Sequence, residues 1–311
     1  MVTAGPRSGG EPASVDRGRR WVAYAALIFA ILCISWSAVL VRWAGIPGPV
    51  SAFYRVLIAA AVLVPWRMTR RSGRLTGPRA IRLALAGGAF FAIDLALFNT
   101  AVLRTSAATA SLLGNNAPVF VGLMTWMFFG RPPRASFWVG LALALAGCAA
   151  IVAADVWEAS ARGDVTGDLM AVSAALFFAA YMLTAEHVRT EMDTLTFSSL
   201  AAVGSAATLL IICLLLDMPL RGFSGRTWAA LVALGLVSQL TAYFALVYAL
   251  GHLPATRTSV GLLAQAPLTA LLAVPTLGEP LSWPLAGGGA LVLAGIYVVN
   301  RPQSGPCLRM K

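Results

Sequence analysis

Ten apolar stretches, each about as long as a membrane crossing, follow one another along this chain with short connections between them. A helix needs about 20 apolar residues to cross the hydrocarbon core of a bilayer. Read between charges, prolines and glycines, the stretches cover 21–41, 50–66, 82–103, 106–129, 136–154, 168–187, 196–216, 227–250, 256–276 and 282–300. The pattern predicts an all-α integral membrane protein with ten transmembrane helices.

The composition excludes the main soluble classes of protein. Only 11% of the 311 residues are charged, whereas soluble globular domains carry roughly 25%. The net charge of +11 does not indicate nucleic-acid binding, because the basic residues lie in short runs between apolar stretches. The four cysteines show no CxxC or Cys/His spacing, so we expect neither a metal site nor another cofactor. The expected partners are the lipid bilayer and a small-molecule substrate.

Lysine and arginine are divided unevenly between the two sides of the membrane that ten crossings define. The segments on the side of the N-terminus hold 17 of these residues, the opposite loops hold five, and Arg55 lies within a stretch. Cytoplasmic segments of membrane proteins carry the excess of positive charge. We therefore predict a multi-pass protein of the plasma or inner membrane with both termini in the cytoplasm.

Short motifs recur at a nearly constant spacing in the two halves of the chain. Two motifs recur 148 residues later: Gly130-Arg131-Pro132 as Gly278-Glu279-Pro280, and Leu145-Ala146-Gly147 as Leu293-Ala294-Gly295. A third motif, Asn116-Ala117-Pro118, recurs after 149 residues as Gln265-Ala266-Pro267. Each half holds five stretches, and an odd number of crossings inserts the two copies in opposite directions. The sequence therefore predicts two inverted five-helix repeats, a common construction of secondary transporters.

The predicted organisation of the chain has five parts. They are a cytoplasmic head at 1–20, a first repeat at 21–154, an external linker at 155–166, a second repeat at 167–300 and a cytoplasmic tail at 301–311.

These motifs resemble those of a known transporter family. The run Pro47–Pro65, which contains Ser51-Ala52-Phe53-Tyr54-Arg55, is similar to the second helix of an EamA-domain transporter of the drug/metabolite transporter superfamily. The stretch Thr105–Gly147 resembles the end of its first unit, and the run from Gly167-Asp168-Leu169 to Gly295 resembles the second. The family commonly has Gly-Glu after the fourth and ninth helices; Glu279 keeps it, and Arg131 replaces the first. The resemblance implies a ten-helix carrier of small metabolites.

Two charged residues lie deep inside predicted helices, where charges are costly and usually functional. Asp94 lies about 18 Å along its helix from Arg82 and about 15 Å from Arg104, close to the midplane. It is a candidate for binding a substrate ammonium group or exchanging protons, and the alternative is a buried structural acid. Arg55 lies at a similar depth on the preceding helix, so it either pairs with Asp94 or extends toward the outer interface.

Polar and aromatic residues near two prolines complete the candidate site. Asn116 and Gln265 each precede a proline, Pro118 and Pro267, which are predicted to kink their helices and free a backbone carbonyl. Such amides either line a midplane site or hydrogen-bond neighbouring helices. Four further candidates could line the same cavity, with packing as the alternative role: Trp36, Tyr181, Gln239 and Tyr243.

The leading hypothesis is a secondary transporter, and specifically an exporter of amino acids or related metabolites that works by alternating access. No Walker or protease motif is present, so a solute or ion gradient would supply the energy, and proton coupling is left open. The alternatives are an intramembrane lipid-modifying enzyme and a membrane scaffold or sensor that does not transport. The chain could act as a monomer or as a homodimer.

Overall fold

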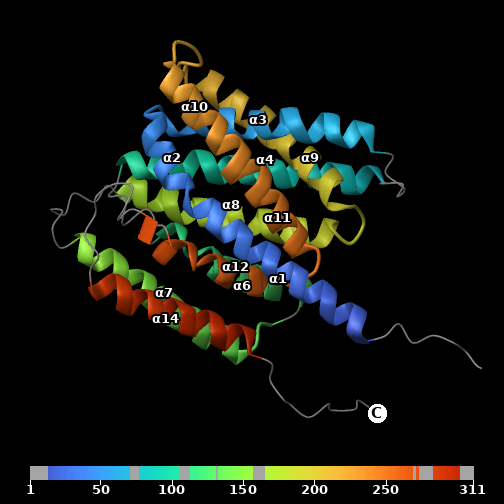
Figure 1. Ribbon diagram of the computed structural model, residues 1–311, viewed down its shortest axis with the longest axis vertical. Helices are drawn as coiled ribbons and strands as arrows, with labels where there is room; N and C mark the ends of the chain where they lie inside the picture. The colour runs from blue at the N-terminus through green and yellow to red at the C-terminus, as the bar shows by residue number, and fades with distance from the viewer. Residues whose placement is uncertain are drawn as a thin grey trace, which may run out of the picture.

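Helices form all the regular structure in the part of the chain that the computed structural model describes, which is residues 13–70, 77–104, 113–130, 132–156, 165–268, 271–272 and 283–301 (Figure 1). In chain order they are α1 (Ala13–Ser35), α2 (Ser37–Ala44), α3 (Gly48–Thr69), α4 (Pro78–Arg104), α6 (Ala117–Phe129), α7 (Ala135–Val156), α8 (Val165–Val188), α9 (Thr194–Leu215), α10 (Gly225–Ala233), η1 (Leu234–Thr241), α11 (Ala242–Leu250), α12 (Ala255–Leu262) and α14 (Trp283–Asn300).

The helices confirm the predicted fold class, an all-α membrane protein with ten helical stretches. Each of the ten predicted stretches overlaps one or more of these helices. Five helical segments among the described residues are long and apolar enough to cross a membrane: Gly48–Thr69, Pro78–Ala101, Val165–Val188, Thr194–Leu215 and Gly225–Leu250. Large apolar side chains of these segments, such as Met68 and Leu215, are mostly exposed. A bilayer would cover such a surface.

The first and eighth stretches depart from a uniform α-helix. The first is interrupted at Trp36, between α1 and α2. The eighth runs from α10 through the π-helix η1 into α11. Gly235 of η1 faces α3, where an added Cβ would lie 2.8 Å from Ile58, and Ser238 donates a hydrogen bond to the carbonyl oxygen of Cys33 in α1. The π-helix is therefore packed between α1 and α3.

Two repeat-related helices are interrupted at equivalent positions. A turn at Asn115-Asn116 precedes α6, and a turn at Leu263-Ala264 follows α12, which is 148 residues later. The backbone N–H of Asn116 donates to Leu113, and the N–H of Ala264 donates to Gly261, again 148 residues apart. A proline lies just beyond each turn and lacks the N–H that would continue the helical bonding.

The helix pairing follows a pseudo-two-fold arrangement. The contact of α4 with α8 has its repeat equivalent in the contact of α11 with α1, and the contact of α4 with α9 has its equivalent in that of η1 with α3. The fifth and tenth stretches, α7 and α14, pack together along the periphery and run in opposite directions (Figure 1). In that view α1 begins at the lower right, and α14 ends at the right-hand end of the α7–α14 pair.

Four glycines show the symmetry at single residues. A Cβ added to Gly140 would lie 2.6 Å from the carbonyl oxygen of Gly295, and one added to Gly147 would lie 2.5 Å from that of Gly288. Gly288 and Gly295 are the repeat equivalents of Gly140 and Gly147, so each glycine contacts the counterpart of the other. Reciprocal contacts of this kind define an isologous interface. Because α7 and α14 are antiparallel, the axis is perpendicular to them, as an inverted repeat requires.

Candidate functional site

Arg55 of α3 is held at the centre of the helix bundle by groups from the other half of the chain and from α2. Its side chain is only 5% exposed. The Nε donates a hydrogen bond of 2.9 Å to Gln239 Oε1 in η1, and Nη1 donates one of 3.2 Å to Ser37 Oγ at the start of α2. The guanidinium carbon lies 5.8 Å from the centroid of the Tyr243 ring in α11. These contacts fix the cation in place, and among the described residues none of them is an ion pair.

Asp94 of α4 is close enough to Arg55 to interact with it electrostatically. Within the described residues the two side chains form no direct ion pair. The contacts of Arg55 are instead with Gln239, Ser37 and Tyr243. Tyr243 interacts electrostatically with both charges. The site therefore holds a separated cation and anion, with an aromatic ring beside them.

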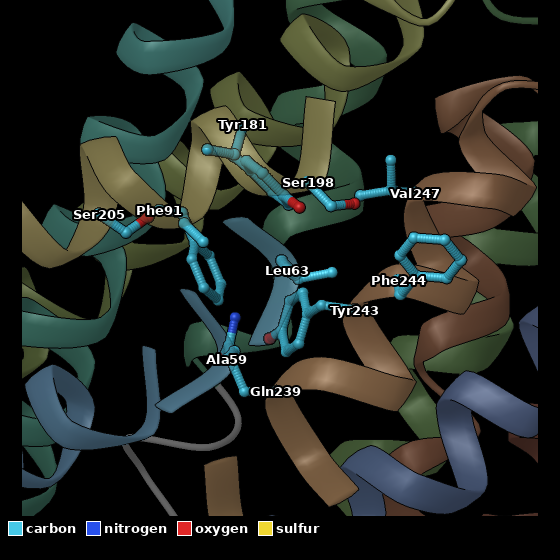
Figure 2. A pocket seen from close by; sticks show the side chains of 12 residues that line it. Ala59, Leu63, Phe91, Tyr181, Ser198, Ser205, Gln239, Tyr243, Phe244 and Val247 are labelled. Atoms are coloured by element: carbon cyan, nitrogen blue, oxygen red, sulfur yellow. The ribbon is translucent and has the colours of Figure 1, made fainter. Parts of the chain in front are cut away.

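A first, small cavity opens beside this group. Its wall comes from α3, α4, α8, α9, η1 and α11, and Figure 2 shows the side chains that line it: Ala59, Leu63, Phe91, Tyr181, Ser198, Ala201, Ala202, Ser205, Gln239, Tyr243, Phe244 and Val247. Aromatic rings stand close together here, with the centroid of Phe91 4.9 Å from that of Tyr181 and 4.6 Å from that of Tyr243. The cavity is thus aromatic, with a few hydroxyl and amide groups.

A second small cavity lies between the turns at Asn115-Asn116 and Leu263-Ala264. Residues of both turns line it, among them Asn115 and Leu263, together with Pro118 and Gln265. Tyr243 belongs to the wall of both cavities. The Tyr243 side chain therefore lies between the charged group, the aromatic cavity and the interruptions.

The structure brings most of the predicted site residues together. Tyr181, Gln239 and Tyr243 line the first cavity, Gln265 lines the second, and Arg55 and Asp94 lie beside them. Trp36 is 37% exposed and lies outside both linings.

The two prolines lie at helix starts. Pro118 is the second residue of α6, and Pro267 follows the turn at Leu263-Ala264. The side-chain amide of Asn116 donates a hydrogen bond of 3.1 Å to the carbonyl oxygen of Leu113. Its neighbour Asn115 lines the second cavity.

Sequence reasoning did not single out Phe91 or Ser198. Phe91 is one of many apolar residues in its stretch, and a single aromatic there carries no signal. Ser198 belongs to the run Thr196-Phe197-Ser198-Ser199 near the start of a predicted helix. A hydroxyl-rich run inside an apolar stretch was the available signal for a polar lining.

The sequence profile of the EamA-like transporter family matches this chain twice, at residues 21–153 and 165–301. The chain belongs to the EamA-like transporter family. It is therefore a multi-pass membrane transporter with two EamA units and not a member of an enzyme family. The resemblance seen in its motifs is confirmed.

Relatives of this transporter include named exporters. It is 31% identical over 219 residues to the pseudopaline exporter CntI of Pseudomonas aeruginosa, covering 70% of this chain and 73% of that one. It is 30% identical over 235 residues to the "Probable terminal-alkyne amino-acid exporter" of Streptantibioticus cattleyicolor, covering 72% and 74%. It is 32% identical over 206 residues to the uncharacterized transporter YwfM of Bacillus subtilis, covering 66% and 68%.

A solved crystal structure has the same fold as this transporter. The two superpose with a TM-score of 0.76, at 23% sequence identity and over 90% of this chain and 98% of the other. At this identity the likeness concerns the fold alone.

Proposed function

We propose that this transporter exports small zwitterionic metabolites of the amino-acid type, by alternating access between its two inverted halves. The observation that carries the proposal is the separated pair of charges formed by Arg55 and Asp94. A zwitterion carries a carboxylate and an ammonium group on one small frame. Guanidinium groups bind carboxylates through directed hydrogen bonds, and the Asp94 carboxylate offers a partner for the ammonium group.

The contacts of Arg55 support a binding role over a purely structural one. A buried charge is retained at a cost, and an isolated structural arginine would be expected in contact with its counter-ion. Here neutral groups orient the guanidinium through Gln239 and Ser37. Tyr243, whose ring lies beside the guanidinium, lines both small cavities, and Gln239 lines the first.

Export is the direction suggested by the relatives, two of which are named as exporters. With both termini in the cytoplasm, as the distribution of basic residues predicts, export moves substrate from the side on which α1 begins to the opposite side. Asp94 is the one acidic residue located in the middle of a predicted stretch, so it is also the candidate for proton exchange. We propose that protons compete with the substrate ammonium group for this carboxylate.

The test is substrate flux in proteoliposomes that contain the folded protein, with and without a pH gradient. Asp94→Asn keeps the shape of the side chain and removes its charge, so we expect at least a tenfold loss of flux and no response to the gradient. Asn116→Ala and Gln265→Ala remove neutral hydrogen bonds, each worth about 1 kcal/mol, so their losses should be smaller.

A matched control is Asp217→Asn. Asp217 is exposed and has a backbone φ of 47°, which asparagine tolerates well. This variant should transport like the wild type. Wild-type flux in Asp94→Asn would overturn the proposed role of the carboxylate. Failure of Asp94→Asn and Arg55→Ala to fold, in the same way, would mean that the two charges form a structural pair.

A further inference from the structure

The C-terminal end of α8 is bound to two other helices, at the end of the molecule that is predicted to face the cytoplasm. Glu186 Oε2 accepts a hydrogen bond of 3.1 Å from the backbone N–H of Ala255, the first residue of α12. Arg189 follows directly after α8, and its Nε donates a hydrogen bond of 3.4 Å to the carbonyl oxygen of Val247 in α11. Its Nη1 donates to the carbonyl oxygen of Met192. The two side chains therefore join α8 to the start of α12 and to the end of α11.

Both contacts place a charge at the helix terminus that favours it. The first N–H groups of a helix carry partial positive charge and its last carbonyl groups partial negative charge. Glu186 lies at the N-terminus of α12 and Arg189 at the C-terminus of α11. Gly251, directly after α11, allows the guanidinium to approach, because an added Cβ there would lie 2.8 Å from Arg189 Nη2. We call Glu186, Arg189 and Gly251 the latch.

The latch lies on the predicted cytoplasmic side of the charged centre. Val247, whose carbonyl oxygen accepts the bond from Arg189, also lines the first small cavity. That cavity extends to Gln239, which holds Arg55. Both α8 and α11 end on the right of Figure 1, the side on which α1 begins. The joined helix ends therefore stand between the charged centre and the side from which an exported solute would come.

The opposite end of the molecule shows no equivalent of the latch in the part of the chain that the structure describes. In the repeat, α1 and α2 correspond to α8, and α4 corresponds to α11. The helices α8 and α11 are in contact, whereas α4 makes no comparable contact with α1 or α2. Between Asp16 and Asp94 the sequence holds no acidic residue, so Glu186 has no counterpart in the first stretch. Such a one-sided contact is what two alternating conformations of an inverted repeat would produce.

We infer that the latch is a cytoplasmic gate, which holds the ends of α8, α11 and α12 together and releases them when the transporter opens to the cytoplasm. An interaction changes the populations of two states only if it differs between them. Contacts made in the closed state alone therefore set how often the cytoplasmic side opens. The inference assumes the alternating access of the proposed function, but its test needs no substrate.

The test measures how fast a thiol reagent labels position 198 of the folded protein in detergent, where the reagent reaches both faces. Ser198 is 8% exposed and lines the first cavity, so Ser198→Cys places a thiol behind the latch. The native Cys213 is buried near the other end of α9 and reports any general loosening of the bundle. Mass spectrometry of the labelled peptides reads the two positions separately.

Each latch variant should raise labelling at position 198 by about 3- to 10-fold, which is the effect of losing one hydrogen bond. Glu186→Gln and Arg189→Gln each remove one charge and keep a polar side chain. Gly251→Ala removes no charge but displaces the guanidinium from α11, and the backbone φ of −75° at this position permits alanine. Labelling at Cys213 should change by less than about twofold.

A matched control is Arg257→Gln. Arg257 lies in the first turn of α12, at the same end of the molecule, and takes part in neither latch contact. Its loss should leave labelling at position 198 as it is in the wild type.

The outcomes separate the gate from the proposed function. Unchanged labelling at position 198 in all three latch variants would overturn the gate. Equal increases at position 198 and at Cys213 would also overturn it, because general loosening would then explain the result. The proposed function is overturned by a different result, wild-type flux in Asp94→Asn.

Discussion

The contact between α7 and α14 allows a quantitative test of the packing. An alanine Cβ at Gly147 would lie 2.5 Å from the carbonyl oxygen of Gly288, whereas ordinary contacts begin near 3.4 Å. The helices would have to separate locally by about 0.9 Å, and overpacking of this kind typically costs about 1–3 kcal/mol. Gly287 lies in the same helix pair, and a Cβ there meets nothing within 4 Å. Alanine is favoured over glycine in a helix by about 1 kcal/mol at both sites, so this gain cancels in the comparison.

The expected result is that Gly147→Ala is less stable than Gly287→Ala by about 1–3 kcal/mol. Thermal unfolding in detergent can be followed with a thiol-reactive dye, because Cys148 and Cys213 are buried in the folded protein and become reactive when it unfolds. Gly287→Ala should melt at or above the wild-type temperature, and Gly147→Ala clearly below it. Equal melting temperatures for the two variants would mean that the close approach of α7 and α14 is not a real constraint on stability.

Three other predictions concern orientation and local structure. Alkaline-phosphatase fusions after Arg74 should be inactive and fusions after Arg162 active, and the reverse pattern would invert the topology. Asp193→Ala should cost about 1 kcal/mol in denaturant melts, because Asp193 caps α9 by accepting two hydrogen bonds from Thr196. Tyr54→Phe should also cost about 1 kcal/mol by the same measurement, because the Tyr54 hydroxyl donates a hydrogen bond of 2.5 Å to the carbonyl oxygen of Leu220. An unchanged free energy of unfolding in either variant would show that water replaces the lost hydrogen bond.

The helical stretches and the repeat could be predicted from sequence because both depend on patterns along the chain. Apolar length identifies a crossing, and the motif around Leu145 recurs with its spacing intact. The π-helix η1 could not be predicted in this way, since its extra residue per turn depends on packing between α1 and α3. The interruption at Trp36 likewise gives no sequence signal, because neither proline nor glycine is present there.

The candidate site was predictable for charged residues and less so for neutral ones. Arg55 and Asp94 stand out because charges are rare in apolar stretches. Which amide enters a cavity depends on the local turn, and here the Asn116 side chain bonds to Leu113 while Asn115 lines the cavity. The partners of Arg55 come from η1 and α2, and one of them, Gln239, lies 184 residues away in sequence. Such long-range pairing follows from tertiary packing, and no local pattern encodes it.

The 148-residue register of the two repeats has a consequence for how an occupant would be oriented. By that register Arg55 corresponds to Val203 and Asp94 to Ala242. The scaffold is therefore nearly the same when viewed from either face of the membrane, but its electric dipole belongs to one half alone. A molecule at the centre meets the Arg55 cation and the Asp94 anion in the same arrangement, whichever face of the membrane it enters from. Exchanging the conformations of the halves would change which face is accessible without reversing the molecule, so a single binding geometry can serve both ends of a transport cycle.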